Sequence, residues 1–255
     1  MVIVIDEFER IASSDEKDKF AEFIKNISTC TETLKFIFCG IATDITELLG
    51  VHPSAGRILE PVEVKTISHD SLWKIIQEPA SAMKVRIDQE KLIRISQISD
   101  GFPHYVHLIA ECLFWAMHDD DHMVESATHK HYIVAIKNAI ERTEAILKNQ
   151  YNKATRKTKN TEDYREALWA LADKSSDQRP LIDIYNISYL KLMLKRLNRD
   201  KISKEKFNQR LLSLRKDSHG KIVVGHGSGW FSFRENIMRG YVRLDAETNG
   251  IPIGE

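Results

Sequence analysis

The sequence has few cysteines and no long hydrophobic run. Its three cysteines, Cys30, Cys39 and Cys112, are widely spaced and form no CxxC pair, which is typical of reduced, buried thiols. No stretch approaches the roughly 18 apolar residues that a membrane span needs. Acids follow almost directly after the short apolar start, unlike in a secretory signal. We therefore expect a cytoplasmic protein that makes no membrane contact.

Several catalytic patterns are also missing. No Ser-His-Asp or Cys-His arrangement has a recognisable spacing, and the glycines at 225, 227 and 229 lie in a predicted hairpin rather than in a dinucleotide-binding turn. The chain has no net charge, but its charge is unevenly spread. From Arg179 onward, 15 lysines and arginines face 8 acids, a net charge of +7, which leaves −7 for the rest. This asymmetry indicates an acidic body with a basic tail.

The first residues predict a buried strand that ends in two acids. Val2 to Ile5 are four β-branched residues, which is typical of a strand in a parallel sheet with both faces covered. Asp6 and Glu7 follow at its carboxyl end, the edge where open α/β sheets bind ligands. A hydrophobic run followed by Asp-Glu resembles the Walker B box of a P-loop ATPase. A buried strand that merely ends in acids at its wet edge is the alternative.

The next segments predict an α/β core. Residues 16–27 have a helical apolar stripe, Leu34 to Gly40 read as a second buried strand, and residues 45–49 as a short helix. Residues 60–67 alternate apolar and polar side chains after Pro61, which favours a third, half-exposed edge strand. Helices are expected over 68–76, 88–98, 105–117 and 126–154.

This order resembles the latter part of an AAA+ ATPase module of the clade that includes DNA-replication initiators. The fold class is then α/β plus α, a partial parallel sheet of about three strands followed by a helical lid and a C-terminal winged helix. The implied boundaries are 1–67 for the core, 68–152 for the lid, 153–163 for a linker, 164–247 for the winged helix and 248–255 for a tail.

The resemblance implies roles for residues around the first sheet edge. Asp6 would hold Mg²⁺ through water, and Glu7 would orient or deprotonate the attacking water. Thr43 follows the second strand at the sensor-1 position, where asparagine is more usual. Arg57 precedes the last core strand and matches an arginine finger, which would act on the nucleotide of a neighbouring copy in a homo-oligomer. A solvated loop arginine is the alternative for Arg57.

The lid carries a second set of expectations. Gly101-Phe102-Pro103 resembles the GxP turn of NACHT and NB-ARC signalling ATPases, in which the proline packs near adenine. His104 stands where many AAA+ lids have a sensor-2 arginine, so either sensor 2 is missing or His104 is a pH-dependent substitute. The GxP turn and the missing sensor-2 arginine together favour an alternative function, that of a STAND-type signalling ATPase whose winged helix contacts protein.

The tail predicts a winged helix with a basic face. Helices are expected near 163–171, 190–197 and 204–216, and they precede two strands joined by a glycine-rich turn. Duplex DNA would be contacted through the phosphates. The expected DNA-binding residues are Lys204, Lys206, Arg210, Arg215, Lys221 and Arg234. A protein-contacting face and a plain solvated surface are the alternatives.

The sequence contains no GxxxxGK[ST] motif. In the resembling family this loop grips the phosphates and precedes the Walker B strand, so we expect the chain to be the latter part of a longer or split protein. ATP and Mg²⁺ are then cofactors of the intact protein, and this chain alone should hydrolyse ATP negligibly. A missing N-terminal portion and duplex DNA are the expected partners. A non-catalytic binding module is the remaining alternative.

Overall fold

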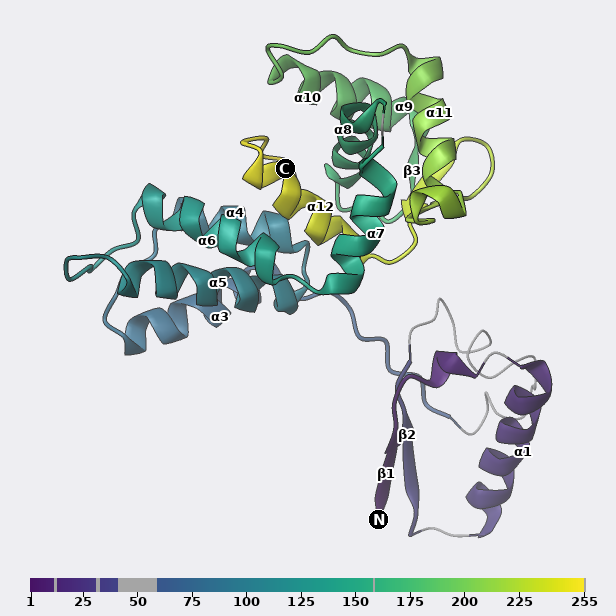
Figure 1. The fold of residues 1–255 in the computed structure, drawn as a ribbon. Coiled ribbons are helices and arrows are strands. Elements are labelled where there is room, and N and C mark those ends of the chain that lie inside the picture. The colour runs from purple at the N-terminus through teal and green to yellow at the C-terminus, as the bar shows by residue number, and fades with distance from the viewer. Residues whose placement is uncertain (12, 31–32, 41–58, 158, 255) are drawn as a thin grey trace. The chain divides into compact units, whose positions relative to one another are not determined.

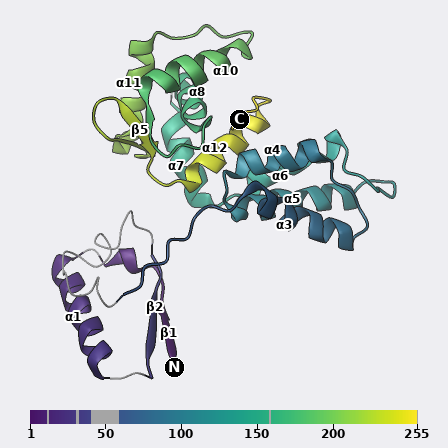
Figure 2. The ribbon, with the colours of Figure 1, turned by 180° about the vertical axis from the view of Figure 1, so that it is seen from behind.

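A computed structural model of the chain describes residues 1–11, 13–30, 33–40, 59–157 and 159–254. It consists of two compact units, Met1–Lys65 and Thr66–Glu255, drawn in Figure 1 and from behind in Figure 2. Within the described ranges, no helix is both long enough and apolar enough to cross a membrane.

The first unit is built on two parallel strands. β1 (Val2–Ile5) pairs with β2 (Lys35–Phe38), with Val2 opposite Lys35 and Ile5 opposite Phe38. Between them lie a short 3-10 turn, η1 (Phe8–Arg10), and the long helix α1 (Ser14–Cys30). The two predicted strands and the helix that connects them are confirmed.

An aromatic cluster holds α1 against one face of the β1–β2 sheet. The ring of Phe8 lies 4.9 Å from that of Phe20 on α1 and 5.3 Å from that of Phe38 on β2. Ala21 and Ile24 complete this small core. The side-chain period of two in a strand sends alternate residues to the opposite face, so this core uses only half of β1.

Two predictions for this unit are wrong. Val2 and Val4 are exposed, so β1 is not buried on both faces in the described structure. Residues 60–67 form no strand, because their alternating side chains find no covering layer and Val62 and Val64 point into solvent. The described core therefore has two parallel strands rather than about three. The short helix predicted at 45–49 lies outside the described residues.

The second unit begins with a helical body. Its helices are α3 (His69–Ala82), α4 (Gln89–Ser99), α5 (Pro103–His118), α6 (His129–Arg142) and α7 (Ala145–Thr155). Ser68, Asp88 and Thr128 cap α3, α4 and α6, each accepting a hydrogen bond from the backbone N–H three residues on. These caps explain why the predicted starts of α3 and α4 are correct.

The single long helix predicted over 126–154 is wrong, because the chain breaks between α6 and α7. Thr143 and Glu144 have extended backbones, with ψ of 152° and 134°. The hydroxyl of Thr143 donates to the carbonyl of Ala139 at 2.9 Å. Such local bonding by threonine competes with helix continuation.

The rest of the second unit contains short helices and a three-stranded sheet. The helices are α8 (Thr161–Ala172), α9 (Leu181–Asp183), α10 (Leu190–Leu194), α11 (Lys204–Leu214) and α12 (Ile237–Thr248), with a π-helical segment η3 (Ile184–Tyr189) between α9 and α10 and a 3-10 turn η4 (Asp217–His219). The strands are β3 (Arg179–Pro180), β4 (Val223–Gly225) and β5 (Trp230–Phe233). Both neighbours of β5 are antiparallel to it, in the order β3-β5-β4.

Helix α12 connects the two cores of this unit. Its Leu244 belongs to the core of the helical body, whereas its Val242 belongs to the core formed by α7, α8, α11 and the sheet. α12 packs against α4, α6 and α8 (Figure 1). The stretch predicted as a linker, 153–163, contains the end of α7 and the start of α8. The division into lid and winged helix stays a prediction, and the structure groups both into one compact unit.

Candidate functional site

The first candidate site is the carboxyl edge of β1 and β2. The backbone N–H of Cys39 donates to the carbonyl of Ile5 at 2.8 Å, and that of Phe8 donates to the carbonyl of Cys39 at 3.0 Å. These bonds extend the strand pairing and place Asp6 and Glu7 directly beside the end of β2. The two acids therefore lie at the carboxyl edge of the parallel pair, where the sequence predicts them.

Local contacts orient the two acids differently. Oδ1 of Asp6 accepts a hydrogen bond from the backbone N–H of Glu7 at 2.8 Å. Glu7 adopts a left-handed backbone, with φ of 53°, and its carboxylate pairs with Arg10 at 2.7 Å. Both partners of this pair are exposed, so it contributes little to stability. Asp6 therefore turns one carboxylate oxygen back to the backbone, whereas Glu7 is held by the arginine one turn on.

These residues do not make a nucleotide site by themselves. Thr43 and Arg57 lie outside the described residues. Mg²⁺ prefers several oxygen ligands with near-octahedral geometry, and phosphates need a cradle of backbone N–H groups. Across the described part of the chain, no group of three or more His, Cys, Asp or Glu side chains could hold a metal. Asp6 and Glu7 are suited to the edge of such a site, but they do not supply the backbone N–H groups that would hold the phosphates.

The turn between α4 and α5 is the second candidate site. Pro103 is the first residue of α5, where its fixed φ suits a helix start. Pro103 and His104 are exposed, and the His104 ring lies edge-on to Tyr105 at 5.2 Å. Asp100 caps α4 with a left-handed backbone, φ 52°. The turn therefore presents Pro103 and His104 outward from a fixed backbone.

Sequence reasoning missed what holds this turn. The carboxylate of Asp100 pairs with Arg239 at 2.7 Å and with Arg243 at 2.9 Å, and all three side chains are almost fully buried. Nε of Arg243 also donates to the carbonyl of Ala172 at 2.7 Å. The sequence did contain a signal for these ion pairs. Arg239 and Arg243 are four residues apart among apolar residues of one helix, and charges that become buried there need partners.

A second ionic cluster joins α8 to the residues around α10 and α11. Arg199 pairs with Asp163 at 2.7 Å and with Glu166 at 2.7 Å, and Arg196 pairs with Glu162 at 2.6 Å. Burial raises the pKa of Glu166, and hydrogen bonding from Arg199 opposes that rise. Arg196 and Arg199, two of the basic residues counted in the tail, are therefore neutralised by acids of α8.

The six predicted DNA-binding residues fall into two groups. Arg210 is turned inward, pairing with Asp163 at 2.9 Å and stacking over the ring of Tyr164. The other five lie on α11 or near the β4–β5 hairpin: Lys204, Lys206, Arg215, Lys221 and Arg234. Their side chains are exposed, except for the half-buried Lys204.

Three of these cations lie beside the β4–β5 hairpin. The guanidinium of Arg215 lies against Gly225 in β4, so close that a Cβ there would stand 2.8 Å from Cζ of Arg215. Nε of Arg234 donates to the carbonyl of Lys221 at 2.8 Å. The ammonium of Lys221 pairs with Asp217 at 2.8 Å in an exposed position. Arg215 therefore lies against the last residue of β4, next to the hairpin turn, whereas Lys221 and Arg234 lie at the open end of the hairpin.

Comparisons with known proteins find a distant structural likeness. No protein-family model matches the chain, and no curated protein is significantly similar to it. The crystal structure of Cdc6p from Pyrobaculum aerophilum aligns with 97% of this chain and 66% of that one, with 13% identity and a TM-score of 0.41. The chain therefore spans just under two thirds of that protein. A likeness this low carries no argument about the function of this chain.

Proposed function

We propose that the chain is part of an AAA+-type, ATP-dependent switch that acts on duplex DNA through a winged helix at residues 164–247. The observation that carries the proposal is the element order of that segment: α8, β3, the α9–α10 helix, α11, and then the β4–β5 hairpin. In a winged helix, a helix-turn-helix relative, the third helix enters the major groove and the hairpin contacts the backbone. Here α11 would be the recognition helix.

The charges of this segment fit such a role. Lys206 on α11, Arg215 at its end, and Lys221 and Arg234 beside the hairpin are exposed. Lysines and arginines that contact phosphates release counterions, which makes binding sensitive to salt. Asn208 and Gln209, also on α11, have side chains that can read base edges. The proposal excludes Arg210 from the contact surface, because Asp163 already holds it.

The first unit would contribute to nucleotide control. Asp6 and Glu7 lie at the carboxyl edge of a parallel strand pair, the position of a Walker B acid pair. Residues 59–66 run on from this unit without regular structure, and Val62 and Val64 there are exposed. Because α12 fastens the helical body to the proposed winged helix, a nucleotide-driven change would act between the first unit and the whole of the second.

The nucleotide part of the proposal is tested by calorimetry. The chain lacks the GxxxxGK[ST] loop, so purified chain titrated with Mg-ATP should show no binding tighter than about 1 mM. Sub-millimolar affinity would show that another grip on phosphate exists. Either result of this titration concerns nucleotide binding only, so the DNA-binding test is independent of it.

The DNA part is tested by fluorescence anisotropy with a duplex of mixed sequence. We expect binding at about 50 mM salt that weakens steeply by about 200 mM. Replacing Arg215 by Ala should weaken binding and reduce the slope of log K against log salt concentration by about 1, the loss of one phosphate contact. Lys137→Ala, an exposed lysine of α6, is the matched control and should leave both unchanged. Absence of binding at low salt would remove the DNA proposal.

A signalling ATPase whose winged helix contacts protein is the second candidate. The observation that favours it is the turn at Gly101-Phe102-Pro103, followed by His104 where a sensor-2 arginine would stand. Asp100, directly before that turn, is tied to Arg239 and Arg243 of α12. The same DNA experiment separates the two candidates, because this one predicts no salt-dependent binding to duplex.

A further inference from the structure

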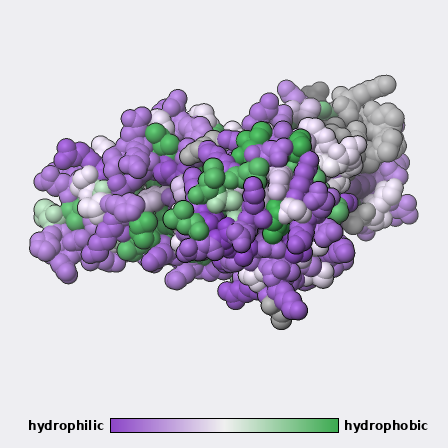
Figure 3. All heavy atoms as spheres, turned by 90° about the horizontal axis from the view of Figure 1, so that it is seen from above, coloured by the Kyte–Doolittle hydropathy of each residue, from purple (hydrophilic) through white to green (hydrophobic). Residues whose placement is uncertain are grey.

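Trp230 is an exposed tryptophan on the central strand of the β3-β5-β4 sheet. It is 42% exposed, although its strand β5 is paired on both sides. Apolar residues also appear at separate places on the hydrophilic surface that Figure 3 shows, and single exposed aliphatic side chains are ordinary. An aromatic ring on a strand with two neighbours is different, because it offers a rigid surface on which another ring can stack.

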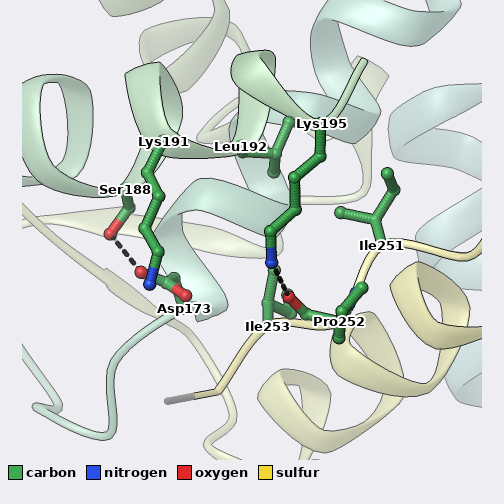
Figure 4. Close-up of a pocket in the computed structure, with 8 residues that line it drawn as sticks. All are labelled: Asp173, Ser188, Lys191, Leu192, Lys195, Ile251, Pro252 and Ile253. Carbon is green, nitrogen blue, oxygen red and sulfur yellow. Dashed lines mark hydrogen bonds between the residues drawn. The ribbon is translucent and has the colours of Figure 1, made fainter. Parts of the chain in front are cut away.

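The polar groups of the small pocket beside the C-terminal segment, by contrast, bond to one another. Ser188 donates to the carboxylate of Asp173 at 2.7 Å, and the ammonium of Lys195 donates to the carbonyl of Pro252 at 3.1 Å. Figure 4 shows both bonds between residues that line the pocket. This pocket therefore belongs to the packing of α10 on the C-terminal segment, and it points to no ligand.

Hydrogen bonds fix the backbone around Trp230. Trp230 lies opposite Pro180 of β3. Its carbonyl accepts from the backbone N–H of His226 at 2.9 Å, and its own N–H donates to the carbonyl of Gly227 at 2.9 Å. Gly227 and Gly229 have φ of 78° and 77°, a conformation that glycine adopts at little cost. A ligand that stacks on Trp230 therefore need not order the strand that carries it.

Trp230 and Arg215 lie on opposite faces of the β4–β5 hairpin. Phe231 lies opposite Gly225 and belongs to the buried core. Directly opposed residues of an antiparallel pair share a face, so the guanidinium of Arg215, which lies against Gly225, is on the Phe231 face. Successive side chains of a strand alternate between faces, which places Trp230 on the other face. The hairpin therefore stands between Arg215 and the indole.

The Trp230 face continues with His226, Ser232 and Arg234. Ser232 and Arg234 follow Trp230 at steps of two residues, and the backbone N–H of Arg234 still pairs with the carbonyl of Ile222 at 2.9 Å. Nε2 of His226 lies 2.7 Å from Oγ of Ser232. The sequence has no acidic residue between Ile222 and Arg234. This face therefore combines an indole, an imidazole and an exposed guanidinium, and the hairpin adds no carboxylate that would repel phosphate.

An indole gains most from nucleic acid where the face of a base is open. In a continuous duplex each base face is covered by the next base pair, whereas an unpaired base can stack on an aromatic side chain, which changes affinity by about 5- to 150-fold. The duplex that α11 and Arg215 would contact lies on the other side of the hairpin. The ligand of Trp230 is therefore a different part of the DNA.

We propose that the Trp230 face binds an unpaired nucleotide, so that the chain recognises duplex DNA at its junction with a single strand. This inference rests on the proposed function, because α11 would hold the duplex while Trp230 stacks on the first unpaired base. Arg234 would contact a phosphate of the same strand. A protein partner would bury the indole but would need a separate acid for Arg234, whereas every nucleotide carries both a base and a phosphate.

The experiment measures anisotropy of three fluorescently labelled DNAs with the full chain. They are a continuous duplex, the same duplex with a short thymidine extension at its 3′ or its 5′ end, and the single strand alone. We expect one of the extended duplexes to bind at least about fivefold more tightly than the continuous duplex or the single strand. In Trp230→Ala, the extended and continuous duplexes should bind equally, because the stacking surface is gone.

Trp115→Ala is the matched control, since Trp115 is a tryptophan of α5 that is 54% exposed, and it should keep the full preference. Trp230→Phe retains an aromatic ring, so it should keep most of the preference but lose the quenching of indole emission that the extended duplex causes in the unmodified chain. Absence of binding to all of these DNAs would overturn the proposed function together with this inference. Binding of the continuous duplex without any preference, a preference that survives in Trp230→Ala, or equally tight binding of the single strand would overturn the junction inference alone.

Discussion

The carboxylate of Asp100 and the guanidinium of Arg243 form a buried ion pair of 2.9 Å between the end of α4 and the middle of α12. The same carboxylate pairs with Arg239, one turn earlier on α12, at 2.7 Å. Burial lowers the pKa of Arg243 to about 10, and the charge of Asp100 opposes that effect. Asp100 therefore compensates Arg243 and shares Arg239 with the exposed carboxylate of Asp177, which lies 2.6 Å from that arginine.

Asp100→Asn should be strongly destabilising. Removing this charge leaves the buried Arg243 without its ion-pair partner and Arg239 with Asp177 alone, and breaking a buried pair typically costs about 3–5 kcal/mol. Urea unfolding followed by circular dichroism measures the loss. Asp121→Asn, which changes an exposed acid after α5, is the matched control. Equal midpoints for the two variants would show that Asp100 does not hold the turn to α12.

Gly240→Ala should also destabilise, against the usual trend in helices. A Cβ at Gly240 of α12 would lie 2.3 Å from the Tyr105 ring, and the hydroxyl of Tyr105 is fixed by the carbonyl of Ile237 at 2.8 Å. Helix propensity alone predicts a gain of up to about 1 kcal/mol, whereas overpacking costs about 1–3 kcal/mol. Thermal unfolding of Gly240→Ala decides between the gain in helix propensity and the cost of overpacking. In the double variant Gly240→Ala with Tyr105→Leu, stability should be restored, because the second substitution removes the Tyr105 ring.

Local signals predicted the helices better than the sheet. Ser68, Asp88 and Ser203 each precede an apolar stripe, and each caps a helix where the sequence places it. The strand predicted at 60–67 had the right alternation, but a strand also needs a neighbour and a layer above it. Neither requirement can be read from the segment itself.

Charge patterning was the least informative signal for the candidate site. The excess of +7 after Arg179 counts Arg199 and Arg210 as surface charge, yet both pair with Asp163, an acid that precedes the basic tail in sequence. Such pairing depends on which helices meet, and that is a tertiary property. By contrast, the position of Asp6 and Glu7 follows from the parallel strand order alone and was predicted correctly.

Arg210→Ala and Arg215→Ala should separate stability from DNA binding. Arg210 bonds to Asp163 at 2.9 and 3.1 Å in a largely buried setting, so its loss should lower the free energy of unfolding by roughly 1–3 kcal/mol. Arg215 is exposed, and its loss should change stability by no more than about 0.5 kcal/mol. For DNA binding, measured by anisotropy at low salt, the order of the two variants should be the opposite: Arg215→Ala should bind duplex DNA more weakly than Arg210→Ala. If Arg210→Ala binds DNA more weakly than Arg215→Ala at the same folded fraction, the assignment of Arg215 to the DNA contact and of Arg210 to the fold is contradicted.

His219 should make the tail less stable in mild acid. Burial, together with the charges of Lys157 and Lys216, lowers the pKa of His219 below its ordinary value near 6.5. The unfolded chain therefore takes up a proton before the folded chain does, and stability falls as the pH drops through about 6.5. Relative to His219→Gln, the unmodified chain should lose stability between pH 7.5 and about 5.5. NMR titration of the imidazole provides a direct check, and a midpoint above 6.5 would reverse the sign.

The open face of the β1–β2 sheet should drive self-association. Val2, Val4 and Ile37 are exposed, and in the described structure β1 pairs only with β2. Exposed strands with apolar side chains template further pairing, and charged residues suppress it. Val4→Lys should therefore reduce concentration-dependent light scattering while leaving the melting temperature almost unchanged. Val64→Lys, which replaces an exposed valine outside any strand, is the control. An equal reduction by both variants would assign the effect to net charge rather than to this sheet face.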